Sequence, residues 1–144
     1  MTAATQSLGA TAWKDSNVVP NIGAYGPIHF HRFPAVTVAT TAIDEIDDIF
    51  ELATVPAGIK ILGFMVTATD MDTNVSPALI YKMRVAAADT TATGITTGQS
   101  AATTVHWCAP VETTALSVID AKVTAAAGTA AQGTVTLGIF YTAV

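Results

Sequence analysis

The chain has 144 residues, of which 51% are hydrophobic and only 12% are charged, and its net charge at pH 7 is −5. That length suits one domain, while the charged fraction lies well below the roughly 25% typical of soluble domains, so we expect other proteins to cover much of the surface. Only six residues are Lys or Arg, which argues against nucleic acid as a partner, and the single cysteine, Cys108, excludes an internal disulfide framework.

Residues 1–33 are predicted to form an extended N-terminal arm. They are mostly small or polar, glycine and proline interrupt them, and bulky aromatic residues occur only at intervals, at Trp13, Tyr25 and Phe30. Isolated aromatic residues in such a segment suit docking onto another surface better than building a core. The first residues lack the basic and apolar regions of a secretory signal.

Residues 34–144 are predicted to form an all-β domain, because Val, Ile, Thr and aromatic residues are enriched and turn residues separate the apolar runs. We expect strands at 35–41, 48–54, 59–69, 78–87, 103–110, 115–125 and 133–143. About seven to eight strands at this spacing indicate an antiparallel β-sandwich or jelly roll. The longest apolar run, 61–66, is far shorter than the about 20 residues of a membrane-spanning helix, so we expect no membrane partner.

Three local patterns add detail to this prediction. Apolar and basic residues alternate over 79–85, which places one face of that strand in the core and the other in water. The Val-Pro-Ala-Gly sequence at 55–58 favours a tight turn and predicts that 48–69 is a hairpin. The polar stretch 89–103, whose only bulky residue is Ile95, is expected to be an exposed and mobile loop.

Histidines in the arm raise the possibility of a metal site. Gly23, His29 and His31 match the first half of the metal-binding motif of cupins, but the glutamate that should follow is missing. A zinc site that joins these two histidines to His106 and Cys108 has suitable ligand types, but its spacing is not diagnostic. We therefore predict no metal, and we interpret the histidines as contacts to a neighbouring subunit.

Two acidic segments contain residue types that bind cations or act as acids and bases. Asp70, Asp72 and Asn74 occupy the first three ligand positions of a calcium loop, but the glycine and the closing glutamate of that loop are absent, so a turn between strands is favoured. The second segment has no neighbouring base to divide acid and base roles, and we expect a solvated patch that consists of Asp44, Glu45, Asp47, Asp48 and Glu51. With no nucleophile elbow and no phosphate-binding loop, the sequence predicts neither an enzyme nor a cofactor.

Residues 47–72, DDIFELATVPAGIKILGFMVTATDMD, resemble a known family. The segment is similar to part of the decoration, or cement, proteins of tailed-bacteriophage heads. The shared pattern is a strand that ends in Leu52, a turn with Pro56 and Gly58, a long apolar strand over 59–69 and an Asp-rich turn. The resemblance implies a sandwich or jelly roll that forms homotrimers on the capsid surface. It also implies a virion protein, assembled in the host cytoplasm, that bridges subunits of the major capsid protein.

The leading hypothesis is therefore a structural, non-enzymatic decoration protein. Its predicted interface with neighbouring subunits consists of Trp13, Tyr25, His29, Phe30, His31, Arg32 and Phe33. The second hypothesis is a carbohydrate-binding or adhesin-like sandwich on a tail or surface, for which Trp13, Tyr25 and Trp107 are candidate contacts. The third is a cupin-like metalloenzyme.

Overall fold

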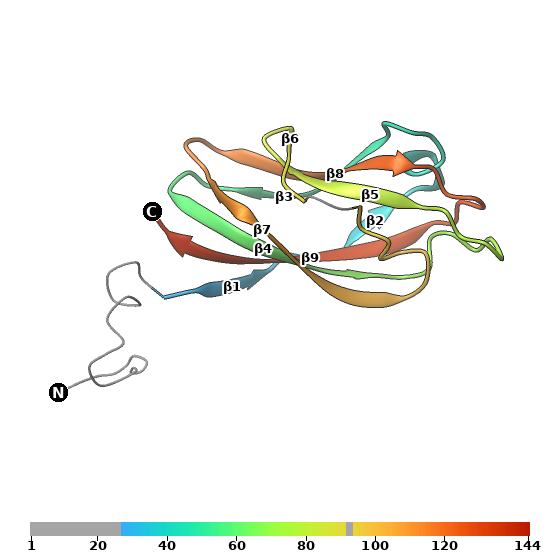
Figure 1. Cartoon of the computed structure of the whole chain (residues 1–144), viewed down its shortest axis with the longest axis horizontal. Helices are drawn as coiled ribbons and strands as arrows, with labels where there is room; N and C mark the ends of the chain where they lie inside the picture. The colour runs from blue at the N-terminus through green and yellow to red at the C-terminus, as the bar shows by residue number, and fades with distance from the viewer. Residues whose placement is uncertain (1–26, 92–93) are drawn as a thin grey trace. The chain divides into compact units, whose positions relative to one another are not determined.

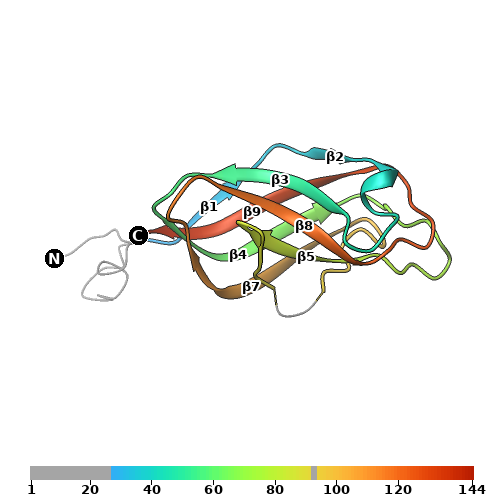
Figure 2. The same cartoon turned by 90° about the horizontal axis from the view of Figure 1, so that it is seen from above.

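The computed structural model describes residues 27–91 and 94–144, which form nine strands and one short 3-10 helix, η1 (Thr40–Ala42). Two sheets lie one above the other (Figures 1 and 2). The first sheet has the order β1-β9-β4-β7, with β2 also paired to β9, and the second has the order β3-β8-β5-β6. The first sheet consists of β1 (His29–Arg32), β2 (Val36–Val38), β4 (Ile59–Ala68), β7 (Ala102–Glu112) and β9 (Gly133–Ala143). The second consists of β3 (Ile49–Val55), β5 (Ile80–Val85), β6 (Ala88–Asp89) and β8 (Ser117–Ala125).

The predicted all-β sandwich is confirmed. Strand β9 has the predicted bounds, and β3, β4 and β8 differ from their predictions by two residues or fewer at each end. The alternation over 79–85 is confirmed as well, because Tyr81, Met83 and Val85 are buried while Lys82 and Arg84 lie on the opposite face of β5. No helix among the described residues is long and apolar enough to span a membrane.

The predicted hairpin over 48–69 is wrong. Strand β3 pairs with β8 in one sheet, whereas β4 pairs with β7 in the other, so the turn at 56–58 carries the chain from one layer to the other. Thr113, a distant residue, stabilises the turn through two hydrogen bonds. Gly58 donates its N–H to the Thr113 carbonyl at 2.8 Å, and the Thr113 hydroxyl donates to the Pro56 carbonyl at 2.8 Å. Turn residues reverse the chain, but only the apolar faces decide which strands pair.

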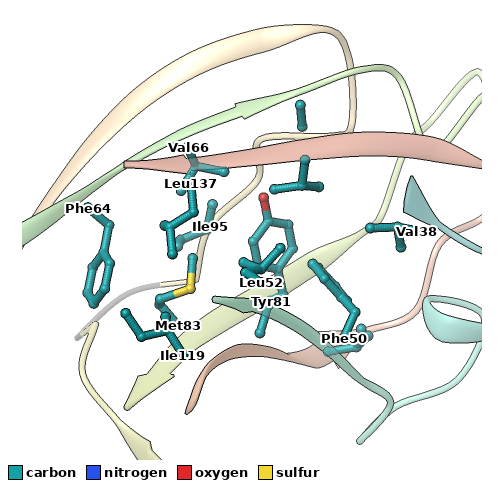
Figure 3. Packing of buried hydrophobic residues seen from close by; sticks show 14 of the residues in the cluster. Val38, Phe50, Leu52, Phe64, Val66, Tyr81, Met83, Ile95, Ile119 and Leu137 are labelled. Atoms are coloured by element: carbon teal, nitrogen blue, oxygen red, sulfur yellow. The ribbon is translucent and has the colours of Figure 1, made fainter. Parts of the chain in front are cut away.

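The core lies between the two sheets (Figure 3). The rings of Phe50 from β3 and Tyr81 from β5 meet edge to face with centroids 5.4 Å apart, and Phe64 of β4 is fully buried. Alternate residues of each strand reach this layer, which explains why the strands show period-two patterns.

The segment 94–100 is packed, so the expectation of an exposed loop is wrong there. Ile95 is buried, and its backbone exchanges two hydrogen bonds with Tyr81, at 2.7 and 3.1 Å. The Tyr81 hydroxyl donates to the Thr97 carbonyl at 2.6 Å, and the Thr97 hydroxyl is hydrogen-bonded to that of Thr104. A single apolar residue therefore anchors an otherwise polar segment against β5.

The segment predicted as an arm reaches the sheet at its C-terminal end. Residues 29–32 form β1, and Phe33 donates its N–H to the Leu137 carbonyl at 2.8 Å while its ring packs against the core. The division of the chain at residue 33 stays a prediction, since residues 1–26 lie outside the described residues.

Candidate interaction surface

Strand β1 carries the described part of the predicted interface. His29, Phe30, His31 and Arg32 are exposed, whereas Phe33 is half-buried. The ring centroids of His31 and Phe33 are 4.7 Å apart in an edge-to-face arrangement. The Phe30 ring contacts the ring of Phe140 in β9 at a tilt. Trp13 and Tyr25 lie outside the described residues.

The histidines of the possible zinc site, which would join His29 and His31 to His106 and Cys108, lie on strands at opposite edges of one sheet. His31 is in β1 and His106 is in β7, and β9 and β4 lie between them. Three strand spacings of about 4.8 Å separate the two strands by about 14 Å, too far for side chains to share one zinc ion. Within 27–91 and 94–144, no group of three or more His, Cys, Asp or Glu residues is placed to hold a metal.

His106 and Cys108, the two candidate ligands on β7, face the interior of the sandwich. Cys108 packs against the core, and burial raises the pKa of its thiol, which favours the protonated form. His106 is hydrogen-bonded through Nε2 to the Thr104 hydroxyl at 2.7 Å, and burial lowers the pKa of its imidazole. A protonated thiol is a poor nucleophile, so this pair gives no support to cysteine catalysis.

The Asp-rich segment forms a run of turns. The Asp70 carboxylate accepts the Asp72 N–H at 3.2 Å, the Asp72 carboxylate accepts the Asn74 N–H at 3.3 Å, and the Asn74 side-chain oxygen accepts the Ser76 N–H at 2.9 Å. The oxygens that would hold calcium in a binding loop are used here to shape the backbone. This agrees with the turn that the sequence favoured.

Asp72 also joins two distant loops. Its Oδ2 atom accepts N–H groups from Ala78, Leu79 and Gly128 at 2.7, 3.0 and 2.9 Å, and Oδ1 accepts the Thr129 N–H at 2.9 Å. The residue is only 1% exposed. Burial alone would raise the pKa of this carboxyl, but the backbone donors outweigh burial and hold the pKa well below its usual range. Asp72 is therefore a structural residue, a role that the turn pattern did not reveal.

The acidic patch is mostly solvated, as predicted. Asp44, Glu45, Asp47 and Glu51 are exposed, and Asp48 is half-buried. The Asp48 carboxylate accepts the Glu45 N–H at 3.0 Å, and the Asp47 Oδ1 atom lies 3.5 Å from Lys122 Nζ. Neither contact sets up an acid and a base that face a common substrate position.

Three aromatic side chains form a row across the outer face of the first sheet, which we call the aromatic row: Phe30 of β1, Phe140 of β9 and Trp107 of β7. The ring centroids of Phe30 and Phe140 are 4.9 Å apart, and those of Phe140 and Trp107 are 4.8 Å apart. Trp107 remains 64% exposed. Phe30 and Trp107 were each candidate contacts from the sequence, whereas Phe140 was not.

Glycines beneath the row make room for two of its rings. A Cβ atom on Gly138 would lie 2.4 Å from the Phe30 ring, and one on Gly63 would lie 2.6 Å from Trp107 Cε3. Glycine inside a strand often marks such a close approach, so Gly63 and Gly138 are the signal of the row that the sequence contains.

Gly63→Ala is expected to lower the free energy of unfolding by about 1–3 kcal/mol, because the added methyl group displaces the Trp107 ring and presses on the His106 carbonyl 3.0 Å away. Urea unfolding followed by circular dichroism measures the change. In the background Trp107→Ala the same substitution should cost less, since the ring is gone. Equal costs in the two backgrounds would show that the ring does not depend on Gly63.

The outer faces of the two sheets differ in charge. From Gly63 to Thr67 of β4 and from Thr103 to Trp107 of β7, the outward residues are uncharged: Gly63, Met65 and Thr67 lie opposite Trp107, Val105 and Thr103. The charged residues of these two strands, Lys60 and Glu112, form an ion pair beyond the irregularity in register. On the second sheet, Arg84 and Asp120 form a bidentate pair with distances of 2.7 and 2.9 Å, and Lys82 lies opposite Lys122. An uncharged outer face that carries exposed aromatic rings is typical of a protein-binding surface.

Comparison with known proteins finds fold likeness only. No protein-family model matches the chain, and no curated protein matches its sequence. A chain of the cyanophage Pam1 capsid asymmetric unit is similar in structure with a TM-score of 0.67 and 18% identity, over 92% of this chain and 96% of that one. A chain of the capsid of Ralstonia phage GP4 is similar with a TM-score of 0.69 and 18% identity, over 94% of both chains. The protein thus shares its fold with chains found in two phage capsids.

Proposed function

We propose that the protein is a structural, non-enzymatic component of a phage virion, and more specifically a decoration protein. In this proposal it sits on the capsid surface as a homotrimer, binds the major capsid protein and bridges neighbouring coat subunits, after assembly in the host cytoplasm. The observation that carries the proposal is the likeness in fold to chains of two phage capsids over more than nine-tenths of this chain.

The surface of the sandwich supports the same proposal. The aromatic row lies beside outward residues that carry no charge over 63–67 of β4 and 103–107 of β7, and Phe30 of this row also belongs to the interface predicted from the sequence. Apolar rings that stay exposed in one chain gain free energy when another protein covers them, at about 25 cal/mol per Å² of apolar area. Many identical contacts of this kind on a shell add through avidity.

Shells assembled from the major capsid protein of the proposed virus provide the test. We expect the protein to sediment with such shells and to raise the temperature at which they dissociate. The variant Phe30→Ser/Arg32→Glu should bind at least tenfold more weakly, because it removes a ring and reverses a charge at the predicted interface. The control Ile49→Ser, at an exposed position of the other sheet, should bind normally. Absence of sedimentation with the unmodified protein would refute the proposal.

Exposed rings in a row also favour a second candidate, a carbohydrate-binding module, because sugars stack on aromatic side chains. Trp107 is the most exposed ring of the row. Binding to a glycan array that Trp107→Ala abolishes, together with no binding to shells, would favour this candidate over the virion protein.

A further inference from the structure

Strand β7 is the edge of the first sheet and has no strand on its outer side among the described residues. Figure 2 shows it at the margin of the sandwich. From Ala102 to Trp107 it pairs in regular antiparallel register with β4, and the irregularity in register comes only after Trp107. An edge strand directs alternate N–H and C=O groups away from its sheet, so this stretch is a template for one more strand.

The other edges are protected in ways that β7 is not. Strand β3 carries an irregularity between Glu51 and Ala53 and follows the acidic patch. The β5 side is covered by the two-residue strand β6 and by the backbone of Ile95. The β1 edge has only four residues and contains Arg32. Bulges, charges and short strands are the usual means by which proteins prevent pairing at an edge, and 102–107 has none of them.

The side chains of this stretch suit an apolar and uncharged partner. Val105 is 46% exposed, Trp107 is more so, and both face outward beside the uncharged residues of β4. The nearest acidic residue on the strand is Glu112, beyond the irregularity, where it pairs with Lys60 at 3.4 Å. A charged strand would lose solvation here without a partner for its charge.

One segment of the chain itself has the required chemistry. Residues 1–26, which precede the described residues, contain only two charged residues, Lys14 and Asp15, and include the β-branched residues Val18, Val19 and Ile22. Fully extended, 26 residues reach at most about 90 Å, enough to cross to a neighbouring molecule. The segment leads into β1, a strand of the same sheet.

We propose that residues 1–26 of a second copy add a strand to the β7 edge at Ala102–Trp107 and cover Val105 and Trp107. Main-chain hydrogen bonds supply affinity, and alternate apolar side chains of the segment contact Val105 and the side of Trp107 that faces the edge, since the Trp107 ring itself leans over Gly63 of β4. Each copy gives its segment and receives another, so the interface is heterologous, and three such contacts close a ring. The inference rests on the homotrimer of the proposed function and names the contact that builds it.

The test uses the full chain with p-benzoylphenylalanine in place of Trp107. Copies labelled with ¹⁵N are mixed with unlabelled copies, irradiated and analysed by mass spectrometry. We expect crosslinks from position 107 of one label to residues 1–26 of the other. Crosslinks to β7 of another copy, crosslinks confined to one label, or none at all would each overturn the proposal.

A matched pair of substitutions provides a second measurement. Val105 and Ile49 are both 46% exposed on edge strands of opposite sheets. Val105→Lys should raise the dissociation constant of the oligomer at least tenfold in light scattering, whereas Ile49→Lys should leave it unchanged. Equal effects of the two would overturn the proposal. An oligomer that forms the expected crosslinks but does not bind shells would refute the proposed function alone, and shell binding without these crosslinks would refute the strand addition alone.

Discussion

Asp72→Asn is expected to lower the free energy of unfolding at pH 7 by about 3–5 kcal/mol. The carboxylate accepts N–H groups at both oxygens, from Leu79 nearby and from Gly128 and Thr129, which lie 56 and 57 residues further along the chain. An amide keeps one oxygen and turns its NH₂ group toward the donors that the other oxygen served, so those buried N–H groups lose their acceptor. Urea unfolding followed by circular dichroism gives the value.

The same residue makes the stability depend on acid. Because the pKa of Asp72 is lower in the folded protein than its unfolded value of about 3.9, its contribution is complete above about pH 5 and is lost as the pH falls through the range below 4. Each pH unit in that range removes up to about 1.4 kcal/mol from this one group. The unfolding free energy of Asp72→Asn should therefore fall less steeply between pH 4 and pH 2.5 than that of the unmodified protein.

Asp70→Asn is the matched control, because Asp70 lies two residues away in the same run of turns but is exposed and accepts a single bond at 3.2 Å. Asp70→Asn should lower the free energy of unfolding by no more than about 1 kcal/mol. Similar losses for the two variants would mean that turn formation, and not the link between the loops, explains the role of Asp72.

Asp120→Ala should lower the free energy of unfolding by about 2–4 kcal/mol, because it leaves the Arg84 guanidinium without its bidentate acceptor. The two side chains are only 12% and 10% exposed, and Asp120 Oδ1 lies 2.7 Å from Arg84 Nε. Glu51 faces Asp120 from β3 but is exposed, and its strand is two positions away from β5 in the sheet. Urea unfolding of the single variants gives the cost of breaking the pair.

Replacing both partners separates the value of the pair from the cost of an unpaired charge. Arg84→Met/Asp120→Leu should unfold within about 1 kcal/mol of the unmodified protein, because no charge is then left without a partner. The exposed pair of Lys60 and Glu112 is the control, and Glu112→Ala should cost less than about 1 kcal/mol. A double variant as unstable as Asp120→Ala would contradict this account.

Strand positions were predictable from the sequence wherever one face of a strand is buried and the other is wet. Alternation over 79–85 fixed the orientation of β5, and the Thr-rich alternation of 133–143 fixed the bounds of β9. Period-two patterns survive in such strands because each side chain has one environment. The local sequence carries this information by itself.

Pairing partners were not predictable, because they depend on contacts between distant segments. The turn at 56–58 has the residues of a hairpin but joins two layers. Conversely, β5 and β6 form a true hairpin through Ala86 and Ala87, whose φ angles of 52° and 66° are normally adopted by Asn or Gly. Two alanines give no turn signal, so this connection could not be found in the sequence.

The candidate surface was predicted in part. Phe30 was assigned to an interface from its place in a Gly- and Pro-rich segment; that assignment stays a prediction, and the structure shows its ring in the aromatic row. Phe140 could not be assigned, since its strand reads as ordinary β structure and only the sheet order brings it between Phe30 and Trp107. The role of Asp72 was hidden for the same reason, because Gly128 and Thr129 approach it only in the folded chain.

The exposure of Trp107 has a spectroscopic consequence. The chain has two tryptophans, and Trp107 lies outside the core, on the face that we propose a second copy covers. The other, Trp13, belongs to the segment proposed to cover it. Intrinsic fluorescence of this protein should therefore change mainly with concentration, as indole groups leave water on assembly, while the unfolding of the sandwich itself is followed better through its tyrosine and backbone signals.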